Sequence, residues 1–156
     1  MVPQFGRPEP GRDYKDRPAA FGIALREGRI ALVKVDKGEQ GWWLDLPGGA
    51  LDPGEDARAA VVREFGEETG LMVEPGLELA RADQYFVNTD GEAFNNRGAF
   101  FAVQVVREDA ALKVEDDHTL TWLEADMALR RLRHDAHAWA VAAWMRRGVA
   151  TGPGRR

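Results

Sequence analysis

The stretch GGALDPGEDARAAVVREFGEETGL, residues 48–71, constrains the fold more than any other part of this sequence. Its apolar spacing predicts a helix over about residues 55–69. On such a helix Glu64, Glu67 and Glu68 share one face, because positions i, i+3 and i+4 are surface neighbours. Like charges at these spacings destabilise an isolated helix by about 0.2–0.5 kcal/mol per pair. The stretch therefore predicts a helix whose acidic face needs a positive group in front of it.

A divalent cation suits such a face. Carboxylate oxygens are the ligands that Mg²⁺ and Mn²⁺ prefer, and Mg²⁺ usually joins a few carboxylates to the phosphate oxygens of a substrate. The simpler interpretation of three glutamates taken alone is a solvated acidic stripe. The residues around the three glutamates decide between a metal site and a solvated stripe. We expect Mg²⁺ or Mn²⁺ as the cofactor.

Composition excludes several classes of protein. The 156 residues suffice for one domain with a hydrophobic core, and no apolar run reaches the roughly 18–20 residues that a membrane helix needs. A net charge of −5 argues against an extended nucleic-acid surface. The absence of cysteine excludes disulfides and thiolate metal sites. The start of the sequence has no apolar core typical of a secretory signal, so we expect a cytoplasmic protein.

The order of the expected elements predicts an α/β fold with a mixed sheet. Residues 1–18 are predicted to be an extended N-terminal segment, residues 19–147 a single domain, and residues 148–156 a flexible tail. Two short apolar runs separated by a turn at Gly28 indicate a β-hairpin. The expected strands are 19–25, 30–35, 42–46, 77–87, 97–106 and 119–123, and the further helices are 125–132 and 135–147.

The acidic stretch resembles the Nudix hydrolase signature, G-x5-E-x7-R-E-U-x-E-E-x-G-U, in which U is a bulky apolar residue. Every specified position matches, from Gly49 through Glu55 and Arg63 to Gly70, with Phe65 at the first U as a mild variation. The sequence LPGG before it is the usual entry to this box. The resemblance implies an α/β/α sandwich around a central mixed sheet over roughly residues 17–147.

The resemblance also implies a role for each box residue. Glu64, Glu67 and Glu68 are carried over as metal ligands, with the carbonyl of Gly48 as a further oxygen. Arg63 is expected to pair with Glu55 and to orient the catalytic group, which consists of Glu64, Glu67 and Arg63. Gly49, Glu55 and Gly70 form the structural frame, and Gly49 also approaches the substrate. Gly66 has no role that the pattern explains.

An acidic loop, VEDDHTLTW at 114–122, precedes the last expected strand, where related sequences often carry another acid. A fourth metal ligand is therefore predicted there, either Asp116 or Asp117, with Asp116 named first; a solvated turn is the alternative. His118, His134 and His137 are interpreted as structural, because a zinc site would need further nitrogen or sulfur ligands nearby.

Aromatic residues offer weaker indications of the substrate. Trp42 and Trp43 point to opposite sides of a strand, so Trp43 is a candidate for stacking on a base, although core packing of both is the simpler interpretation. Tyr85 lies in the region after the box where families of this type place specificity residues. The proline that marks many ADP-ribose hydrolases is absent there.

The predicted function is metal-dependent hydrolysis of a nucleoside diphosphate linked to another group. A nucleoside triphosphate giving monophosphate and pyrophosphate, as in the MutT-like branch, is favoured. Hydrolysis of ADP-ribose or a dinucleoside polyphosphate, a non-catalytic nucleotide sensor, and decapping of RNA ends are the alternatives. The expected partner is a small nucleotide, with no membrane and no extended nucleic acid; a homodimer is left open.

Overall fold

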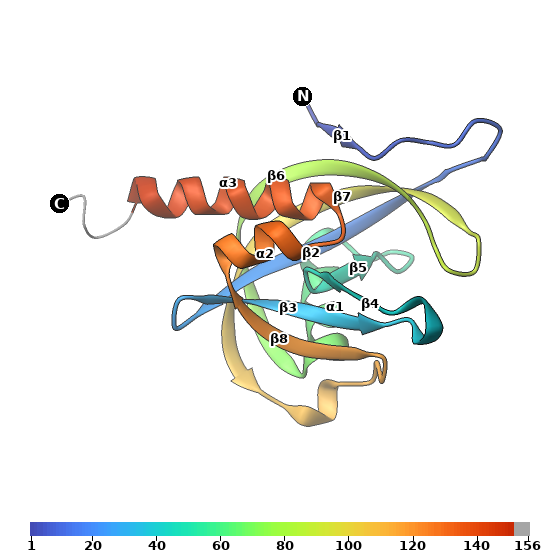
Figure 1. Ribbon diagram of the computed structural model, residues 1–156. Helices are drawn as coiled ribbons and strands as arrows, with labels where there is room; N and C mark the ends of the chain where they lie inside the picture. Colours follow the sequence, from blue (N-terminus) through green and yellow to red (C-terminus); the bar gives the residue numbers. More distant parts are fainter. Residues whose placement is uncertain (152–156) are drawn as a thin grey trace.

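The computed structural model describes residues 1–151 and shows a curled mixed sheet with helices on both faces (Figure 1). The strands follow the order β1-β6-β7-β2-β3-β4, while β5 pairs with β2 and β8 pairs with β3. The strands are β1 Gln4–Phe5, β2 Lys15–Arg26, β3 Arg29–Asp36, β4 Trp42–Asp45, β5 Gly48–Ala50, β6 Leu71–Val87, β7 Ala93–Glu108 and β8 His118–Glu124. The helices are α1 Ala57–Thr69, α2 Ala125–Arg131 and α3 Asp135–Thr151, with short 3₁₀ turns at Gly38–Gln40 and Ala110–Leu112.

The predicted hairpin is formed by β2 and β3. Its two loop residues, Glu27 and Gly28, both have positive φ angles of 51° and 78°, as a type I′ turn requires. On its other side β2 runs parallel to β7, from Lys15 opposite Phe94 to Ala24 opposite Val103. Strand β2 therefore lies in the middle of the sheet, as the apolar run at 19–25 predicted.

The sheet extends further than the sequence pattern indicated. Strand β2 already begins at Lys15, inside the segment that we expected to be an extended lead-in, and β6 begins at Leu71 instead of 77. Gln4 and Phe5 add a short parallel strand at the edge beside β6. The added start of β2, residues 15–18, is a polar stretch whose backbone pairs with β7, and such pairing leaves no apolar pattern in the sequence. The added start of β6 is apolar on one face, with Leu71 and Val73 buried, but it is too short to indicate a strand before Pro75 and Gly76.

Two hydrophobic cores lie on opposite faces of the sheet. Strand β2 contributes to both because its side chains alternate, with Phe21 and Ile23 on one face and Ala20 and Ala24 on the other. The first core packs against α2 and α3, and the second packs against α1. The fold is thus the expected sandwich of helices around a mixed sheet (Figure 1).

Helix α3 packs through an apolar stripe, with Ala136 and Ala140 buried and Trp139 against Phe5. It continues to Thr151, so residues 148–151 are helical where a loose tail was expected. The rest of that predicted tail, residues 152–156, lies outside the described residues. No helix in the described chain is both long enough and apolar enough to span a membrane.

Candidate active site

Helix α1 carries the acidic residues, and both of its ends are capped. The side chain of Asp56 accepts a hydrogen bond from the backbone N–H of Ala59 at 2.8 Å, which satisfies a free donor of the first turn. Gly70 adopts the left-handed conformation with φ of 75°, and its N–H donates to the carbonyl of Gly66. These caps hold the helix between the glycine-rich strand β5 and strand β6.

Arg63 is the centre of the acidic face. Its Nε and Nη2 donate to the two carboxylate oxygens of Glu55, both at 2.8 Å. Its Nη1 donates to Glu64 at 3.0 Å and to Glu67 at 3.1 Å, and Nη2 also reaches the carbonyl of Ala50. The hydrogen bonds from Arg63 lower the pKa of Glu55 to about 2. One guanidinium thus ties the loop before the helix to two of the three clustered glutamates.

The two glycines of β5 let the backbone lie directly against the other side of the cluster. A Cβ on Gly48, which has φ of 148°, would lie 2.2 Å from the carbonyl oxygen of Ala20. A Cβ on Gly49 would lie 3.0 Å from the carboxylate of Glu64. The N–H of Gly48 donates to Glu68 Oε1 at 2.9 Å. Side chains at these positions would displace the carboxylates or the strand.

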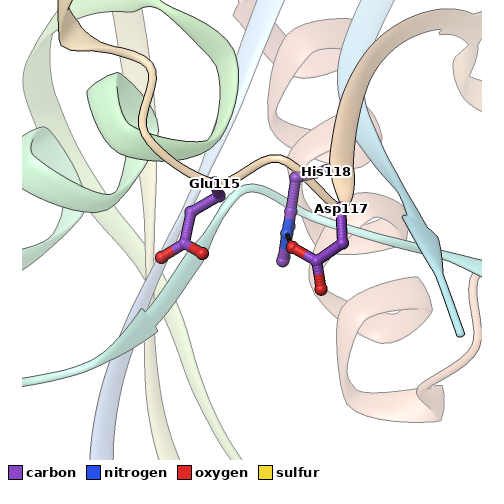
Figure 2. A group of neighbouring side chains, drawn as sticks. All are labelled: Glu115, Asp117 and His118. Atoms are coloured by element: carbon purple, nitrogen blue, oxygen red, sulfur yellow. Dashed lines mark hydrogen bonds and ion pairs between the residues drawn. The ribbon is translucent and has the colours of Figure 1, made fainter.

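The acidic loop before β8 closes the site from a third side. The backbone N–H groups of Val114 and Glu115 donate to the carbonyl of Glu67 at 2.9 and 3.1 Å. This loop brings three potential ligand atoms, from Glu115, Asp117 and His118, within 4.8 Å of one another, and Figure 2 shows the two carboxylates and the imidazole side by side. The predicted ligand loop is therefore next to the end of the box helix.

His118 contacts the glutamate cluster directly. Its Nε2 lies 3.1 Å from Glu68 Oε2, and its Nδ1 lies 2.8 Å from Asp117 Oδ1. Sequence reasoning missed this contact, although the acidic run immediately before His118 was the available signal. Asp116, which the sequence analysis placed first as a fourth ligand, is exposed and is outside this group, whereas its neighbour Asp117 belongs to it.

Burial and pairing shift the charges of this group in a defined way. Burial raises the pKa of Glu68 to about 7, with the hydrogen bonds from His118 and Gly48 opposing that rise. Burial lowers the pKa of His118, but its hydrogen bond and charge interaction with Glu68 outweigh this effect and raise the pKa to about 9. Burial also raises the pKa of Glu64. The cluster is therefore an environment in which additional positive charge is stabilised.

A cleft of about 160 Å³ extends from this cluster. Arg133 is on its wall and donates to both oxygens of Asp45, at 3.2 and 2.8 Å, while its guanidinium lies 4.1 Å from the ring centre of Trp43. Trp43 thus supports an arginine of the cleft. The lining residues are Arg17, Phe21, Asp45, Gly48, Glu68, Phe86, Asn88, Asn96, His118, Arg133, His134 and His137.

Tyr85 does not line this cleft, whereas its neighbour Phe86 does. The ring of Tyr85 packs edge-on against Tyr14 at 5.1 Å, on the opposite side of the strand. Trp42 is 47% exposed, so the expected core packing of both tryptophans is wrong for this residue. The sequence located the region in which the aromatic residue of the cleft lies, but not the face of the strand to which each ring points.

The oxygen atoms of the cluster fit a hard divalent cation. In the described chain, Glu64 and Glu67 each have one carboxylate oxygen that Arg63 does not contact. Both oxygens of Glu68 accept hydrogen bonds, yet a carboxylate has about four lone-pair sites and retains acceptor capacity. Carboxylates with one imidazole beside them suit Mg²⁺ or Mn²⁺ in the way that the acidic pattern predicted.

Comparison with known proteins agrees with this geometry. The NUDIX domain model matches residues 15–145. The chain is 32% identical over 114 residues to an RNA pyrophosphohydrolase of Sphingopyxis alaskensis, covering 65% of this chain and 71% of that protein. It is 41% identical over 54 residues to an ADP-ribose pyrophosphatase of Methanocaldococcus jannaschii, which covers 35% of this chain and only 32% of that protein.

Solved structures show the same fold. A NUDIX hydrolase from Nitrosomonas europaea superposes with a TM-score of 0.69 at 20% identity, covering 84% of this chain and 89% of that one. A MutT NUDIX hydrolase from Burkholderia pseudomallei gives a TM-score of 0.61 at 26% identity, covering 83% and 98%. With the complete box on α1 and a family match over most of its length, the chain belongs to the Nudix family of pyrophosphohydrolases.

Proposed function

We propose that this protein hydrolyses a nucleoside triphosphate to the nucleoside monophosphate and pyrophosphate, with Mg²⁺ or Mn²⁺ held by Glu64, Glu67 and Glu68. The observation that supports the proposal is the convergence of these three carboxylates, held by Arg63 and β5, with Glu68 lining a small cleft. When bound, a divalent cation supplies charge neutralisation of phosphate oxygens and activation of a water.

The chain's own residues hold the carboxylates in position before substrate arrives. Arg63 fixes Glu64 and Glu67, while the N–H of Gly48 and the ring of His118 fix Glu68. Oxygens that are already oriented need little rearrangement during the reaction, which favours the transition state. We assign the carbonyl of Gly48 as a further ligand. Asp117 and Glu115 are better placed than Asp116 to join from the loop.

The size of the cleft supports a substrate with one nucleoside. Its volume of about 160 Å³ is below the roughly 300–1,000 Å³ of pockets that enclose most of a drug-sized ligand. ADP-ribose and dinucleoside polyphosphates carry a second ribose or nucleoside, which needs binding surface beyond this cleft. A nucleoside triphosphate has one nucleoside and needs less additional surface. A cytoplasmic location remains a prediction, and a homodimer is left open.

The test is a substrate panel analysed by chromatography with Mg²⁺ at mildly alkaline pH. Nucleoside triphosphates should be converted to monophosphate and pyrophosphate faster than ADP-ribose or dinucleoside polyphosphates are hydrolysed. Faster turnover of either competitor contradicts the substrate assignment, and orthophosphate as first product contradicts the position of cleavage. Tight nucleotide binding with no turnover of any member of the panel supports the sensor alternative instead.

A second candidate substrate is a 5′-triphosphorylated RNA. The exposed ring of Trp42 favours it, because Lys34 Nζ lies 4.4 Å and the guanidinium of Arg131 lies 5.7 Å from the ring centre. An aromatic ring flanked by cations is a suitable platform for a base of a single strand. Under this alternative, Trp42→Ala should slow release of pyrophosphate from such an RNA by about tenfold and leave hydrolysis of a free triphosphate unchanged.

A further inference from the structure

Arg17 lies in the cleft beside the acidic cluster, on strand β2 and directly opposite Asn96 of β7. Its Nε donates to Asn96 Oδ1 at 2.8 Å. Its guanidinium carbon lies 4.3 Å from the ring centre of Phe94 and 5.2 Å from that of Phe86. One hydrogen bond and two aromatic rings therefore fix the orientation of this guanidinium.

The terminal nitrogens of Arg17 make no polar contact with residues 1–151. Within residues 1–151, Nη1 and Nη2 have no hydrogen-bond acceptor and no carboxylate partner, whereas Arg133 on the same cleft donates twice to Asp45. A half-buried guanidinium without a partner loses hydration and gains no compensating contact. Burial accordingly lowers the pKa of Arg17, and the charge of Glu64 opposes this shift. Arg17 thus combines a fixed orientation with two unoccupied donors near the cluster.

We propose that Arg17 is a substrate-positioning residue whose two terminal nitrogens bind the oxygens of a phosphate in the nucleotide's polyphosphate chain. A planar guanidinium can donate from its two terminal nitrogens to two phosphate oxygens at once. The hydrogen bond at Nε fixes the direction in which these nitrogens point. This inference rests on the proposed function for the nature of the substrate, but it concerns phosphate binding and not the chemical step. Recognition of a base edge is the competing role of such a group.

The test measures binding of inorganic tripolyphosphate by calorimetry in EDTA, which requires neither turnover nor a metal. Arg17→Gln should weaken binding at least about tenfold, because a charge-assisted pair is lost. Arg17→Lys should give an intermediate loss, since it keeps the charge without the fork. Arg81→Gln, which alters an exposed arginine paired with Glu78 on β6, should bind like the parent.

Kinetics with a nucleoside triphosphate give the second readout. Arg17→Lys should raise KM by a factor similar to the loss of tripolyphosphate affinity and change kcat by less than about threefold, as expected for a contact made equally in ground and transition states. A structural role would instead lower the melting temperature and kcat together. Arg17→Lys, which keeps the side-chain stem and its charge, serves for both measurements if Arg17→Gln does not fold.

The outcomes separate this inference from the proposed function. Unchanged tripolyphosphate affinity in both Arg17 variants, or no binding by the parent, overturns the inference whatever the turnover. If the Arg17 variants lose affinity for the nucleotide but keep their affinity for tripolyphosphate, Arg17 contacts the base, and the inference is also overturned. Weaker tripolyphosphate binding in a protein that hydrolyses no triphosphate supports the inference and overturns only the proposed function.

Discussion

At the residue scale, Arg63 explains how three glutamates can share a helix face. Its guanidinium contacts Glu64 and Glu67, so a positive group already lies against the cluster before any cation binds. The bidentate pair with Glu55 keeps that guanidinium in place. Because Arg63 occupies only one oxygen of Glu64 and one of Glu67, the second oxygen of each remains for a metal.

Replacing Glu67 by Gln should lower kcat at least about a hundredfold, since a loss of roughly 3 kcal/mol of transition-state stabilisation has that effect. The amide keeps the size of the side chain but not its charge, so the fold should persist. Glu74→Gln, at an exposed position on β6, is the matched control and should retain the parental rate. Initial rates with a saturating triphosphate measure both. A normally folded Glu67→Gln enzyme with near-parental kcat contradicts the metal assignment.

At the element scale, helix α1 carries one box glycine, Gly66, for which the structure shows no catalytic contact. Gly66 is buried and faces Leu112. A Cβ there would lie 3.5 Å from the nearest atom of Leu112, an ordinary van der Waals distance. The position therefore tolerates alanine in the space available.

Gly66→Ala should raise the free energy of unfolding by up to about 1 kcal/mol, because alanine loses less backbone freedom in a helix interior. Gly28→Ala provides the opposite control: the space around it is open, but its φ of 78° should make alanine unfavourable by roughly 1–2 kcal/mol. Urea denaturation of both variants measures the two changes. Destabilisation by Gly66→Ala would show that the loop around Leu112 cannot accommodate the methyl group.

At the scale of the whole molecule, two buried histidines lie where the first core meets the cleft. His134 and His137 are buried at this boundary, and the ring of His137 lies 4.4 Å from that of Phe21. His137 Nδ1 accepts a hydrogen bond from the N–H of Leu46 at 3.2 Å, so its ring is neutral in the folded protein. These contacts support the structural role that the sequence suggested for both histidines.

This burial makes stability depend on pH. Burial, followed by the charge of Arg133, lowers the pKa of His137 to about 3. Below its ordinary pKa of about 6.5, the unfolded chain binds a proton that the folded chain does not. The contribution of His137 is therefore complete above that pH and decreases by about 1.4 kcal/mol per pH unit as the pH falls.

In His137→Gln the amide oxygen can accept the hydrogen bond from the N–H of Leu46. This variant should remove about 1.4 kcal/mol per pH unit from the pH dependence of the unfolding free energy. Denaturant titrations at pH 7 and pH 5 for parent and variant give the difference. Nuclear magnetic resonance titration of the parent provides an independent check if the variant is unstable. A ring of His137 that becomes protonated near pH 6 in the folded protein contradicts the prediction.

Metal binding should also be visible in the stability of the whole domain. A cation that binds the folded carboxylates and not the unfolded chain stabilises the fold by about 1.4 kcal/mol at ten times its Kd. Millimolar Mg²⁺ or Mn²⁺ should therefore raise the Tm, whereas sodium chloride at matched ionic strength should not. The double variant Glu64→Ala/Glu68→Ala should lose the effect. An equal rise in that variant would indicate general screening.

The sequence by itself determined the family, the box helix, and the order of most strands and helices. These features depend on local patterns: apolar spacing and the fixed intervals of the acidic motif. The pairing of Arg63 with Glu55 was expected from the family resemblance, and the structure shows it. The resemblance added the roles of residues that composition and spacing cannot assign.

Only the tertiary structure decided which distant residues meet. The contact of His118 with Glu68, the position of Asp117 and not Asp116 beside His118, and the position of Phe86 and not Tyr85 in the cleft all depend on the face of a strand or loop. A shift by one residue reverses that face. Arg17 reaches the cleft because β2 and β7 pair in parallel. Such a pairing is set by the packing of two cores, and local sequence does not encode it.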